Sequence, residues 1–304
     1  MRRLSCSAPA KINLGLRVVA RRANGYHELE SLFVPLDLAD EVAIEIAETE
    51  PTGVEIDVVG RNHGVPADGT NLAVRAAAAF ASAAALRLRI RLRVTKHIPS
   101  GAGLGGGSSD AGAVLRAMRG AYPEAVSGRQ LARIALELGA DVPFFLDPRP
   151  SWVTGIGERL EPVAGAPALP ILLANPGEAL ATERVFRAFD GRPNATLTPA
   201  ARDRTISQPQ TTPRVERNLR WDAIAPRSRS LHNDLEAAAV SLCPPVATLI
   251  EQIRKLGAGQ IGMSGSGPTV YGVFESLDSA RSALARTGFE SPAWARVATT
   301  IDSR

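Results

Sequence analysis

The sequence predicts an α+β protein of two domains. Several segments of its first half alternate apolar and polar residues, which is the pattern of half-buried strands, and an alanine-rich segment is typical of a helix. The 304 residues, of which 45% are hydrophobic, suffice for two packed cores. Around residues 151–162 the pattern changes and a new buried strand follows, so we predict domains at 1–158 and 159–304.

Composition narrows the class of protein. The net charge of +4, from 35 Lys and Arg against 31 Asp and Glu, suits a small anionic substrate and does not require nucleic acid. Cys6 and Cys243 are too few for a disulfide framework, which favours a reducing, cytoplasmic setting. No apolar run approaches membrane-spanning length, and the first predicted strand lies so close to Met1 that we expect no signal or transit peptide.

The first predicted strand, SAPAKINLGLRVV, places Ile12 and Leu14 on one face and Lys11 and Asn13 on the other. Lys11 and Asn13 therefore point the same way, either toward a site or as a solvated face. A turn at Asn24-Gly25 then leads directly into Tyr26, His27 and Glu28. An aromatic ring, an imidazole and a carboxylate at a loop end can bind a polar ring, or they can be ordinary packing and surface.

Three further strands and a helix are predicted before residue 96. DEVAIEIAE and GVEIDVVG alternate as strands, and NLAVRAAAAFASAAAL is a helix that Asn71 can cap. At residues 87–94 four arginines alternate with apolar residues, which predicts another half-buried strand. The first half is therefore a strand-rich sheet with a helix against it.

The glycine-rich segment at 99–115, PSGAGLGGGSSDAGAVL, follows this strand. Its five glycines leave backbone N–H groups uncovered, and Ser108, Ser109 and Asp110 offer capping oxygens to the helix that follows. A helix N-terminus attracts anions through its unpaired N–H groups and its dipole. The succession of strand, glycine loop and helix therefore predicts a phosphate-binding site.

Other interpretations of this loop meet specific objections. The Walker A pattern needs lysine where Ser108 stands, and a protein kinase needs H-R-D and D-F-G strings that do not occur. Gly101, Gly103 and Gly106 satisfy the G-x-G-x-x-G of a nicotinamide oxidoreductase, although no acidic residue ends a second strand at the required spacing. A plain glycine-rich surface turn is another alternative, and the arginine-rich strand leaves open an RNA-binding module.

Asp141 is placed at the exit of a further predicted helix. This helix covers 127–138 and stops at Gly139, so Asp141 precedes the apolar run VPFF. A carboxylate in apolar surroundings needs a cationic or hydrogen-bonding partner, or its pKa rises. Asp141 is therefore either part of a site or a capping or turn aspartate.

The second half is predicted to alternate strands and helices. PALPILLAN is a buried strand, Thr182 caps a short helix in which Phe186 is a core residue, and 190–229 is a long surface excursion. LHNDLEAAAV and PPVATLIEQIRKLGA are helices before a second small-residue loop, MSGSGPTV, which is either a turn or a second backbone wall for phosphate. A helix at 279–286 and a strand at 295–301 complete a β-α-β-like domain.

Three motifs, PAKINLGL, PSGAGLGGGSSDA and MSGSGPTV, resemble in sequence and order those of the galactokinase, homoserine kinase, mevalonate kinase and phosphomevalonate kinase (GHMP) superfamily. Within it, GYHELES, GADVPFF and LHNDLE are similar to the branch that phosphorylates 4-diphosphocytidyl-2-C-methyl-D-erythritol. The resemblance covers nearly the whole chain. It implies a two-domain α+β GHMP kinase fold: a ribosomal-protein-like first domain with a left-handed β-α-β unit, a ferredoxin-like second domain, and ATP between them.

The resemblance also implies roles for individual residues. Asp141 matches the catalytic base and Lys11 the lysine paired with it. A cytosine ring would stack between two aromatic side chains with His27 at its edge, and the substrate-side residues are Asn13, Tyr26, His27, Thr182 and Phe186. The ATP-side residues are Asn71, Leu72, Lys96, Pro99, Gly101, Gly103, Leu104, Gly105, Gly106, Gly107, Ser108 and Ser109. No residue is expected to bind a metal directly, and Asp147-Pro148-Arg149-Pro150 departs from the expected glycine pair and small residue.

The implied reaction is ATP-dependent phosphorylation of the 2-hydroxyl of that substrate. It yields the 2-phosphate and ADP, in the methylerythritol phosphate route to isopentenyl diphosphate. ATP would enter with Mg²⁺, and Asp141 would take the hydroxyl proton. The expected partner is a small molecule with a cytidine diphosphate group, without nucleic acid or membrane, and the protein is expected to be a monomer or a weak homodimer.

Overall fold

The computed structural model describes residues 1–48, 51–61, 64–192, 219–220, 232–288 and 293–302. They form two compact units, each assembled from separate stretches of the chain. The first consists of Met1–Ala10, Leu38–Ser100 and Gly105–Pro148, and the second of Lys11–Asp37, Gly101–Leu104 and Arg149–Arg304. No single cut of the chain separates these units, and the division into 1–158 and 159–304 stays a prediction.

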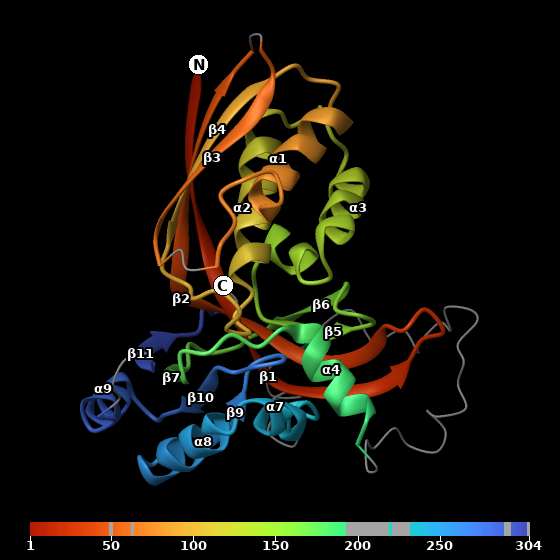
Figure 1. Cartoon of the computed structure of the whole chain (residues 1–304). Coiled ribbons are helices and arrows are strands. Elements are labelled where there is room, and N and C mark those ends of the chain that lie inside the picture. The colour runs from red at the N-terminus through yellow and green to blue at the C-terminus, as the bar shows by residue number, and fades with distance from the viewer. Residues whose placement is uncertain (49–50, 62–63, 193–218, 221–231, 289–292, 303–304) are drawn as a thin grey trace. The chain divides into compact units, whose positions relative to one another are not determined.

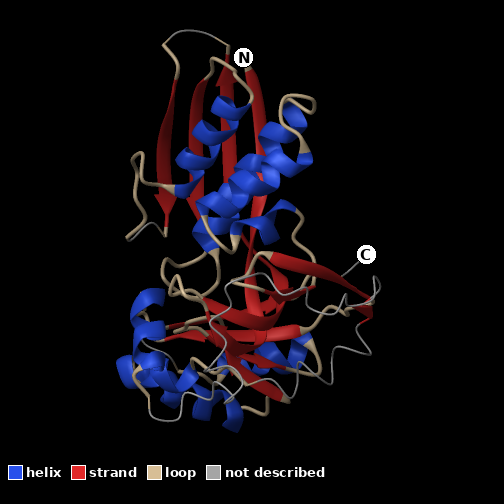
Figure 2. Ribbon diagram, turned by 90° about the vertical axis from the view of Figure 1, so that its right-hand side faces the viewer, coloured by secondary structure: helices blue, strands red, loops and turns tan. Residues whose placement is uncertain are grey.

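The first unit is a sheet with helices on one of its faces (Figures 1 and 2). Its strands are parts of β1 (Arg2–Arg21) and β2 (His27–Ala47), with β3 (Gly53–Gly60) and β4 (Arg89–Lys96). Its helices are α1 (Leu72–Ala83), α2 (Gly106–Ala121), α3 (Gly128–Leu138) and the 3₁₀ helix η1 (Val142–Leu146). β4 pairs parallel with β3 and antiparallel with β2. This mixed pairing differs from the parallel sheet of a dinucleotide-binding fold.

The predicted alternation along β4 is confirmed. Its apolar side chains are buried in the core of the first unit, against α1 and α2: Ile90, Leu92 and Val94. The arginines between them face outward, where Arg89 and Arg91 pair with Glu55, and Arg93 pairs with Asp57. Two carboxylates thus offset part of the positive charge of these three arginines, which weakens the case for an RNA-binding module.

The second unit contains a four-stranded antiparallel sheet in the order β11-β7-β10-β9. Its strands are β7 (Pro170–Asn175), β9 (Gln260–Met263), β10 (Val270–Val273) and β11 (Trp294–Thr299). The helices of this unit are α4 (Thr182–Asp190), α7 (Glu236–Leu242), α8 (Pro245–Lys255) and α9 (Leu277–Ala285). The first strand of this sheet thus lies between the last and the third, which is the ferredoxin-like order that the sequence led us to expect.

The remaining strands of the second unit extend β2. They are β5 (Ser151–Thr154), β6 (Arg159–Ala164) and β8 (Leu219–Arg220). β5 pairs antiparallel with β2 and β6, and β8 pairs parallel with β6. Apart from residues 190–192 and 219–220, the predicted excursion at 190–229 lies outside the described residues. Within the described part of the chain, every helix is too short or too polar to cross a bilayer.

The predicted helix ends are partly confirmed. Asn71 caps α1 by accepting a 2.9 Å hydrogen bond from Ala73 N, and Ser127 forms a capping box at the start of α3. Thr182 is not a cap, because α4 begins one residue earlier than predicted, with Ala181 at the N-cap. Ser108, Ser109 and Asp110 do not cap α2 either, since they lie within that helix.

Candidate active site

The predicted site residues form two groups, one in each compact unit. The first unit holds Asn71, Leu72, Lys96, Pro99, Gly105, Gly106, Gly107, Ser108, Ser109 and Asp141. The second holds Lys11, Asn13, Tyr26, His27, Gly101, Gly103, Leu104, Thr182 and Phe186. Lys11 and Asp141 belong to different units, so their pairing stays a prediction.

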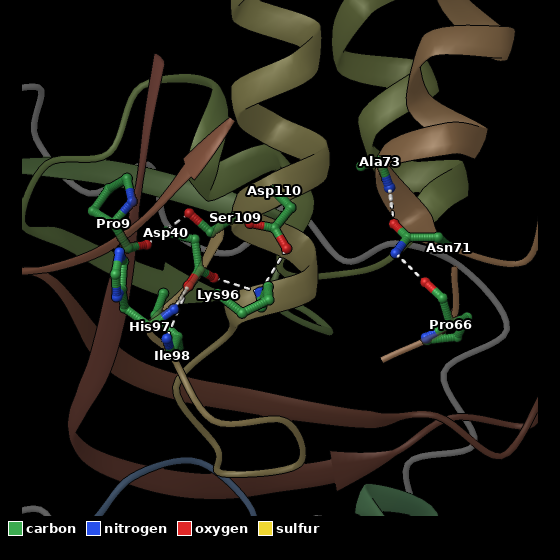
Figure 3. Close-up of polar contacts among 10 residues, drawn as sticks. All are labelled: Pro9, Asp40, Pro66, Asn71, Ala73, Lys96, His97, Ile98, Ser109 and Asp110. Carbon is green, nitrogen blue, oxygen red and sulfur yellow. Dashed lines mark hydrogen bonds and ion pairs between the residues drawn. The ribbon is translucent and has the colours of Figure 1, made fainter. Parts of the chain in front are cut away.

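The N-terminus of α2 has no side-chain cap. The helix begins after Gly105, whose φ of 72° is left-handed, and its first turn contains no acidic residue. The Ser109 hydroxyl donates instead to the Pro9 carbonyl, at 2.7 Å (Figure 3). By contrast, Asn71, Ser127 and Ser276 cap α1, α3 and α9. Among the residues that the structure describes, no side chain accepts a hydrogen bond from the first-turn N–H groups of α2, as suits an anion-binding helix.

Lys96, at the end of β4, lies between two buried carboxylates (Figure 3). Its Nζ donates to Asp110 Oδ2 of α2 at 2.6 Å and to Asp40 of β2. The other oxygen of Asp40 accepts hydrogen bonds from the backbone N of His97 at 2.5 Å and of Ile98 at 2.8 Å. The pair of carboxylates thus fixes the chain as it leaves β4 and ties it to the helix that follows the glycine loop.

The charges of this cluster are strongly coupled. Burial raises the pKa of Asp110 to about 7; Lys96 opposes that rise and Asp40 adds to it. Burial acts to lower the pKa of Lys96, but the two carboxylates outweigh this and raise it. Asp110 Oδ1 is buried and has no hydrogen-bond partner among the described residues. A protonated Asp110 beside Asp40 and the lysine would make the cluster neutral.

Asn71 and Leu72 lie at the start of α1. Both polar atoms of the Asn71 amide have a partner within the protein, since its Oδ1 caps α1 and its Nδ2 donates to the Pro66 carbonyl at 2.7 Å (Figure 3). Leu72 lies beside the glycine loop, where a Cβ on Gly107 would be 3.7 Å from its Cδ1. This side of the first unit therefore combines an apolar side chain with the open end of α2.

Asp141 precedes η1 in the first unit. Its side chain is partly buried and makes no capping hydrogen bond, but the residue lies in a turn before this helix, so the turn aspartate remains an alternative to a site residue. The following Val142, Phe144 and Phe145 are buried, as the sequence predicted. The departure at 147–150 spans the boundary between the units, which falls after Pro148. Among the described residues, no three His, Cys, Asp or Glu side chains are grouped so as to hold a metal ion.

Lys11 and Asn13 lie in a buried chain of hydrogen bonds in the second unit. Lys11 Nζ donates to Asn13 Oδ1 at 2.6 Å, Asn13 Nδ2 donates to Ser31 Oγ at 2.9 Å, and Ser31 donates to the Gly15 carbonyl at 2.6 Å. Lys11 is 3% exposed and Asn13 1%, so the solvated-face alternative is wrong. Ser31, which the sequence did not single out, fixes the orientation of the Asn13 amide.

The second small-residue loop packs against the first part of the glycine loop. Gly103 has φ 75°, and a Cβ there would collide with the Ser264 carbonyl oxygen. Ser264 Oγ donates to the Gly103 carbonyl at 2.9 Å. Asn233 Nδ2 donates to the Gly265 carbonyl at 2.7 Å and to that of Met263 at 2.8 Å. Asn233 is a supporting residue that the motif LHNDLE contained but that we did not select.

The aromatic residues lie near the N-terminal end of β2. The His27 ring stacks on Phe186, with centroids 4.6 Å apart and planes at 18°, and its Nε2 lies 2.7 Å from Asp190 Oδ1. Tyr26 is 57% exposed. The Thr182 hydroxyl is 3.0 Å from that of Ser266 in the second small-residue loop. The imidazole of His27 therefore occupies a face of Phe186, while stacking of a base by Tyr26 stays a prediction.

Comparisons with known proteins agree with these motifs. Residues 71–147 match the family model "GHMP kinases N terminal domain", and residues 217–288 match "GHMP kinases C terminal". The chain is 38% identical over 297 residues to the 4-diphosphocytidyl-2-C-methyl-D-erythritol kinase of Chelativorans sp. (strain BNC1), covering 96% of this chain and 94% of that relative. It is 41% identical over 286 residues to that of Anaeromyxobacter dehalogenans (strain 2CP-C), covering 92% and 84%.

Solved structures show the same relationship. A crystal structure of a 4-(cytidine 5'-diphospho)-2C-methyl-D-erythritol kinase aligns with a TM-score of 0.75 and 36% identity, over 98% of this chain and all of the other (100%). A homoserine kinase from Cytophaga hutchinsonii aligns with a TM-score of 0.72 over 99% of this chain and 95% of the other. Its identity of 17% supports a shared fold alone.

Proposed function

The chain belongs to the 4-diphosphocytidyl-2-C-methyl-D-erythritol kinases of the GHMP family, and from this premise we propose that it transfers the γ-phosphate of ATP to the 2-hydroxyl of that substrate. The products are the 2-phosphate and ADP, and the reaction serves isoprenoid precursor synthesis. The acceptor is a small molecule with a cytidine diphosphate group, and the enzyme acts in the cytoplasm.

The observation that carries this proposal is the uncapped N-terminus of α2. Phosphoryl transfer asks a protein mainly to position the nucleotide and to neutralise charge. Within the described part of the chain, the first-turn N–H groups after Gly105 meet no side-chain acceptor, and the dipole of a 16-residue helix adds positive potential there. These features support binding of the ATP phosphates at Gly105, Gly106, Gly107 and Ser108.

Asp141 is the proposed general base. A sugar-alcohol hydroxyl is a poor nucleophile, and a carboxylate within hydrogen-bond reach can take its proton as the bond to phosphorus forms. Asp141 is a good candidate because it is the aspartate of the motif GADVPFF and its side chain makes no helix-capping hydrogen bond. Lys11, held by Asn13, would keep the base ionised and stabilise the developing alkoxide.

Mg²⁺ fits this site only as a companion of the nucleotide. It prefers oxygen ligands, keeps several waters, and is commonly held by one or two carboxylates together with substrate phosphates. The described residues contain no cluster of three acidic or imidazole side chains that could replace the phosphates. The metal would supply neutralisation of phosphate charge, while positioning falls to the helix N-terminus and the glycine loop.

The test is a kinase assay with Mg-ATP and a panel of alcohols that includes the cytidylyl-erythritol compound. We expect ADP formation with this compound, and ³¹P and ¹³C NMR should place the new phosphate on the 2-hydroxyl. Phosphorylation of homoserine or mevalonate instead, or of another hydroxyl, would overturn the proposal. NAD should neither bind nor change the thermal unfolding temperature.

The base-binding side is tested by Tyr26→Ala and Phe186→Ala at saturating ATP. Loss of one ring that stacks on a base costs about 1–3 kcal/mol, so KM for the cytidylyl substrate should rise roughly 5- to 150-fold. KM for ATP should stay within about twofold of wild type, since neither side chain is assigned to ATP binding. Unchanged KM values for the cytidylyl substrate would mean that the cytosine binds elsewhere.

A further inference from the structure

Asp190 lies at the C-terminus of α4, where the helix dipole disfavours a carboxylate. It is the last residue of α4, and negative charge at a helix C-terminus meets the negative end of the dipole. The side chain has partners outside the helix instead. Oδ1 lies 2.7 Å from Nε2 of His27, and Oδ2 lies 3.6 Å from Nη1 of Arg21 on β1. These contacts account for an acidic residue at this position.

The His27 ring is held on several sides. Phe186 stacks on one face of the ring, and Phe189 contacts the ring edge-on with centroids 6.2 Å apart. Asp190 Oδ1 lies within hydrogen-bond distance of Nε2. The side chain is 7% exposed. No residue that the structure describes forms a hydrogen bond with the other ring nitrogen, Nδ1. Nδ1 is therefore the polar atom of this ring that remains for a ligand.

The contact with Asp190 decides the chemistry of Nδ1. An ionised carboxylate only accepts hydrogen bonds, so the proton between the two groups lies on Nε2. A neutral imidazole carries one N–H, which leaves a lone pair on Nδ1. Cytosine presents an amino donor at position 4, where uracil presents a carbonyl acceptor. An accepting Nδ1 therefore matches cytosine and opposes uracil.

We propose that Asp190 is a specificity-determining positioning residue, which fixes His27 in the tautomer whose Nδ1 accepts a hydrogen bond from the cytosine amino group. Asp190 acts through His27 and does not itself touch the substrate. The inference rests on the proposed function, which places His27 at the edge of the base, and it predicts that a uridine substrate is disfavoured.

The kinetic test compares cytidylyl and uridylyl substrates at saturating ATP and pH 8. It uses the wild type, the isosteric Asp190→Asn, and Asp190→Leu. Asp278→Asn is the matched control, because Asp278 lies on α9 with its side chain 95% exposed. Thermal unfolding of each variant confirms that the sample is folded.

The wild type should prefer the cytidylyl substrate by about 5- to 150-fold in kcat/KM, the range of a single base contact. In both Asp190 variants this preference should fall by a factor of at least about five, because KM for the cytidylyl substrate rises. Their kcat should stay within about twofold of wild type, because no reacting group is changed. The control should keep the full preference.

The tautomer is measured separately, by ¹⁵N NMR of the His27 ring without substrate. We expect the proton on Nε2 in the wild type and a mixture with the Nδ1–H form in the variants. A wild-type proton on Nδ1, or two ring protons, overturns the inference whatever the enzyme phosphorylates. An active kinase whose Asp190 variants keep their full preference overturns it and leaves the proposed function standing. A wild type inactive on the cytidylyl substrate overturns the proposed function, and the inference with it.

Discussion

At the scale of single residues, Asp110 gives the protein a pH-dependent stability. Burial, with a contribution from Asp40, raises its pKa from the usual value of 3.8 to about 7 in the fold, although Lys96 opposes this rise. The folded state then binds more protons than the unfolded state between about pH 4 and pH 7. The stability that Asp110 contributes is therefore fully present below about pH 4 and is lost as pH rises to about 7.

Asp110→Asn should remove this dependence. We expect the difference in free energy of unfolding, variant minus wild type, to rise from pH 4 to pH 7 and to level off above. At pH 8 this difference should exceed its value at pH 4 by about 1 kcal/mol or more. Urea unfolding across this range measures it, with Asp278→Asn as the control for an exposed carboxylate. A constant difference between variant and wild type would show that Asp110 does not titrate in this window.

Asp141→Asn should abolish most turnover while leaving the nucleotide in place. Loss of a general base costs about 100-fold or more in kcat, whereas the N–H groups of α2 are untouched. Calorimetry should give a Kd for ATP within about twofold of wild type, and Asp278→Asn should keep normal turnover. Near-normal kcat in folded Asp141→Asn would remove this residue from the mechanism.

Asp40 shows what a sequence can and cannot reveal about a single residue. It interrupts the apolar register of β2 between Leu38 and Val42, so its burial was detectable from the pattern. Its partner Lys96 is 56 residues away, and no local pattern links the two. The same limit explains Lys11 and Asn13, whose burial on a seemingly polar strand face comes from the rest of the second unit.

At the scale of secondary-structure elements, a substitution in the first turn of α2 tests the predicted phosphate-binding site. Gly106 has helical backbone angles, so a larger residue is disfavoured there by lack of space. A Cβ would lie 3.0 Å from Ile98 Cγ2 and 3.4 Å from Lys96 Nζ. Gly106→Val should raise KM for ATP by about tenfold or more and change KM for the cytidylyl substrate less. Gly120→Val, in the same helix with open space around it, is the matched control. Equal effects of the two substitutions would contradict the loop assignment.

Substitutions at the caps of α1 and α3 distinguish an effect on stability from an effect on ATP binding. Removing either cap should lower stability by about 1 kcal/mol, since each satisfies an N–H group of its helix. Asn71→Ala should also raise KM for ATP, because α1 begins beside the glycine loop, while Ser127→Ala should leave it unchanged. Thermal unfolding and steady-state kinetics on both variants decide the matter. A matching rise in KM for Ser127→Ala would show that only stability is involved.

The elements themselves were largely predictable, but their ends were less so. Alternation and helical propensity suffice for β3, β4, α1 and α3, because local sequence dominates there. The start of α2 was predicted wrongly, since the expected caps lie inside the helix and the Ser109 hydroxyl contacts Pro9, 100 residues away. The unpartnered helix end is therefore a consequence of tertiary structure.

At the scale of the whole molecule, the two units are interleaved along the chain. The core of the second unit includes Leu16 and Val18 of β1 together with Leu235 and Val246, which are more than half the chain away. Separate fragments 1–158 and 159–304 should therefore be insoluble or unfolded, because each leaves apolar surface without its partners. Soluble fragments with cooperative unfolding transitions would show that the predicted domains are autonomous.

The interleaving also governs how the protein can form during synthesis. Met1–Ala10 belongs to a unit that is completed only at Pro148, and Lys11–Asp37 to one that also needs the C-terminal half. At about 5–20 residues per second, the ribosome delivers these partners on the order of ten seconds or more after the first strands emerge. During that interval β1 and β2 can pair with each other but lack the other strands and helices that cover them in the fold, so we expect the nascent chain to bind holding chaperones.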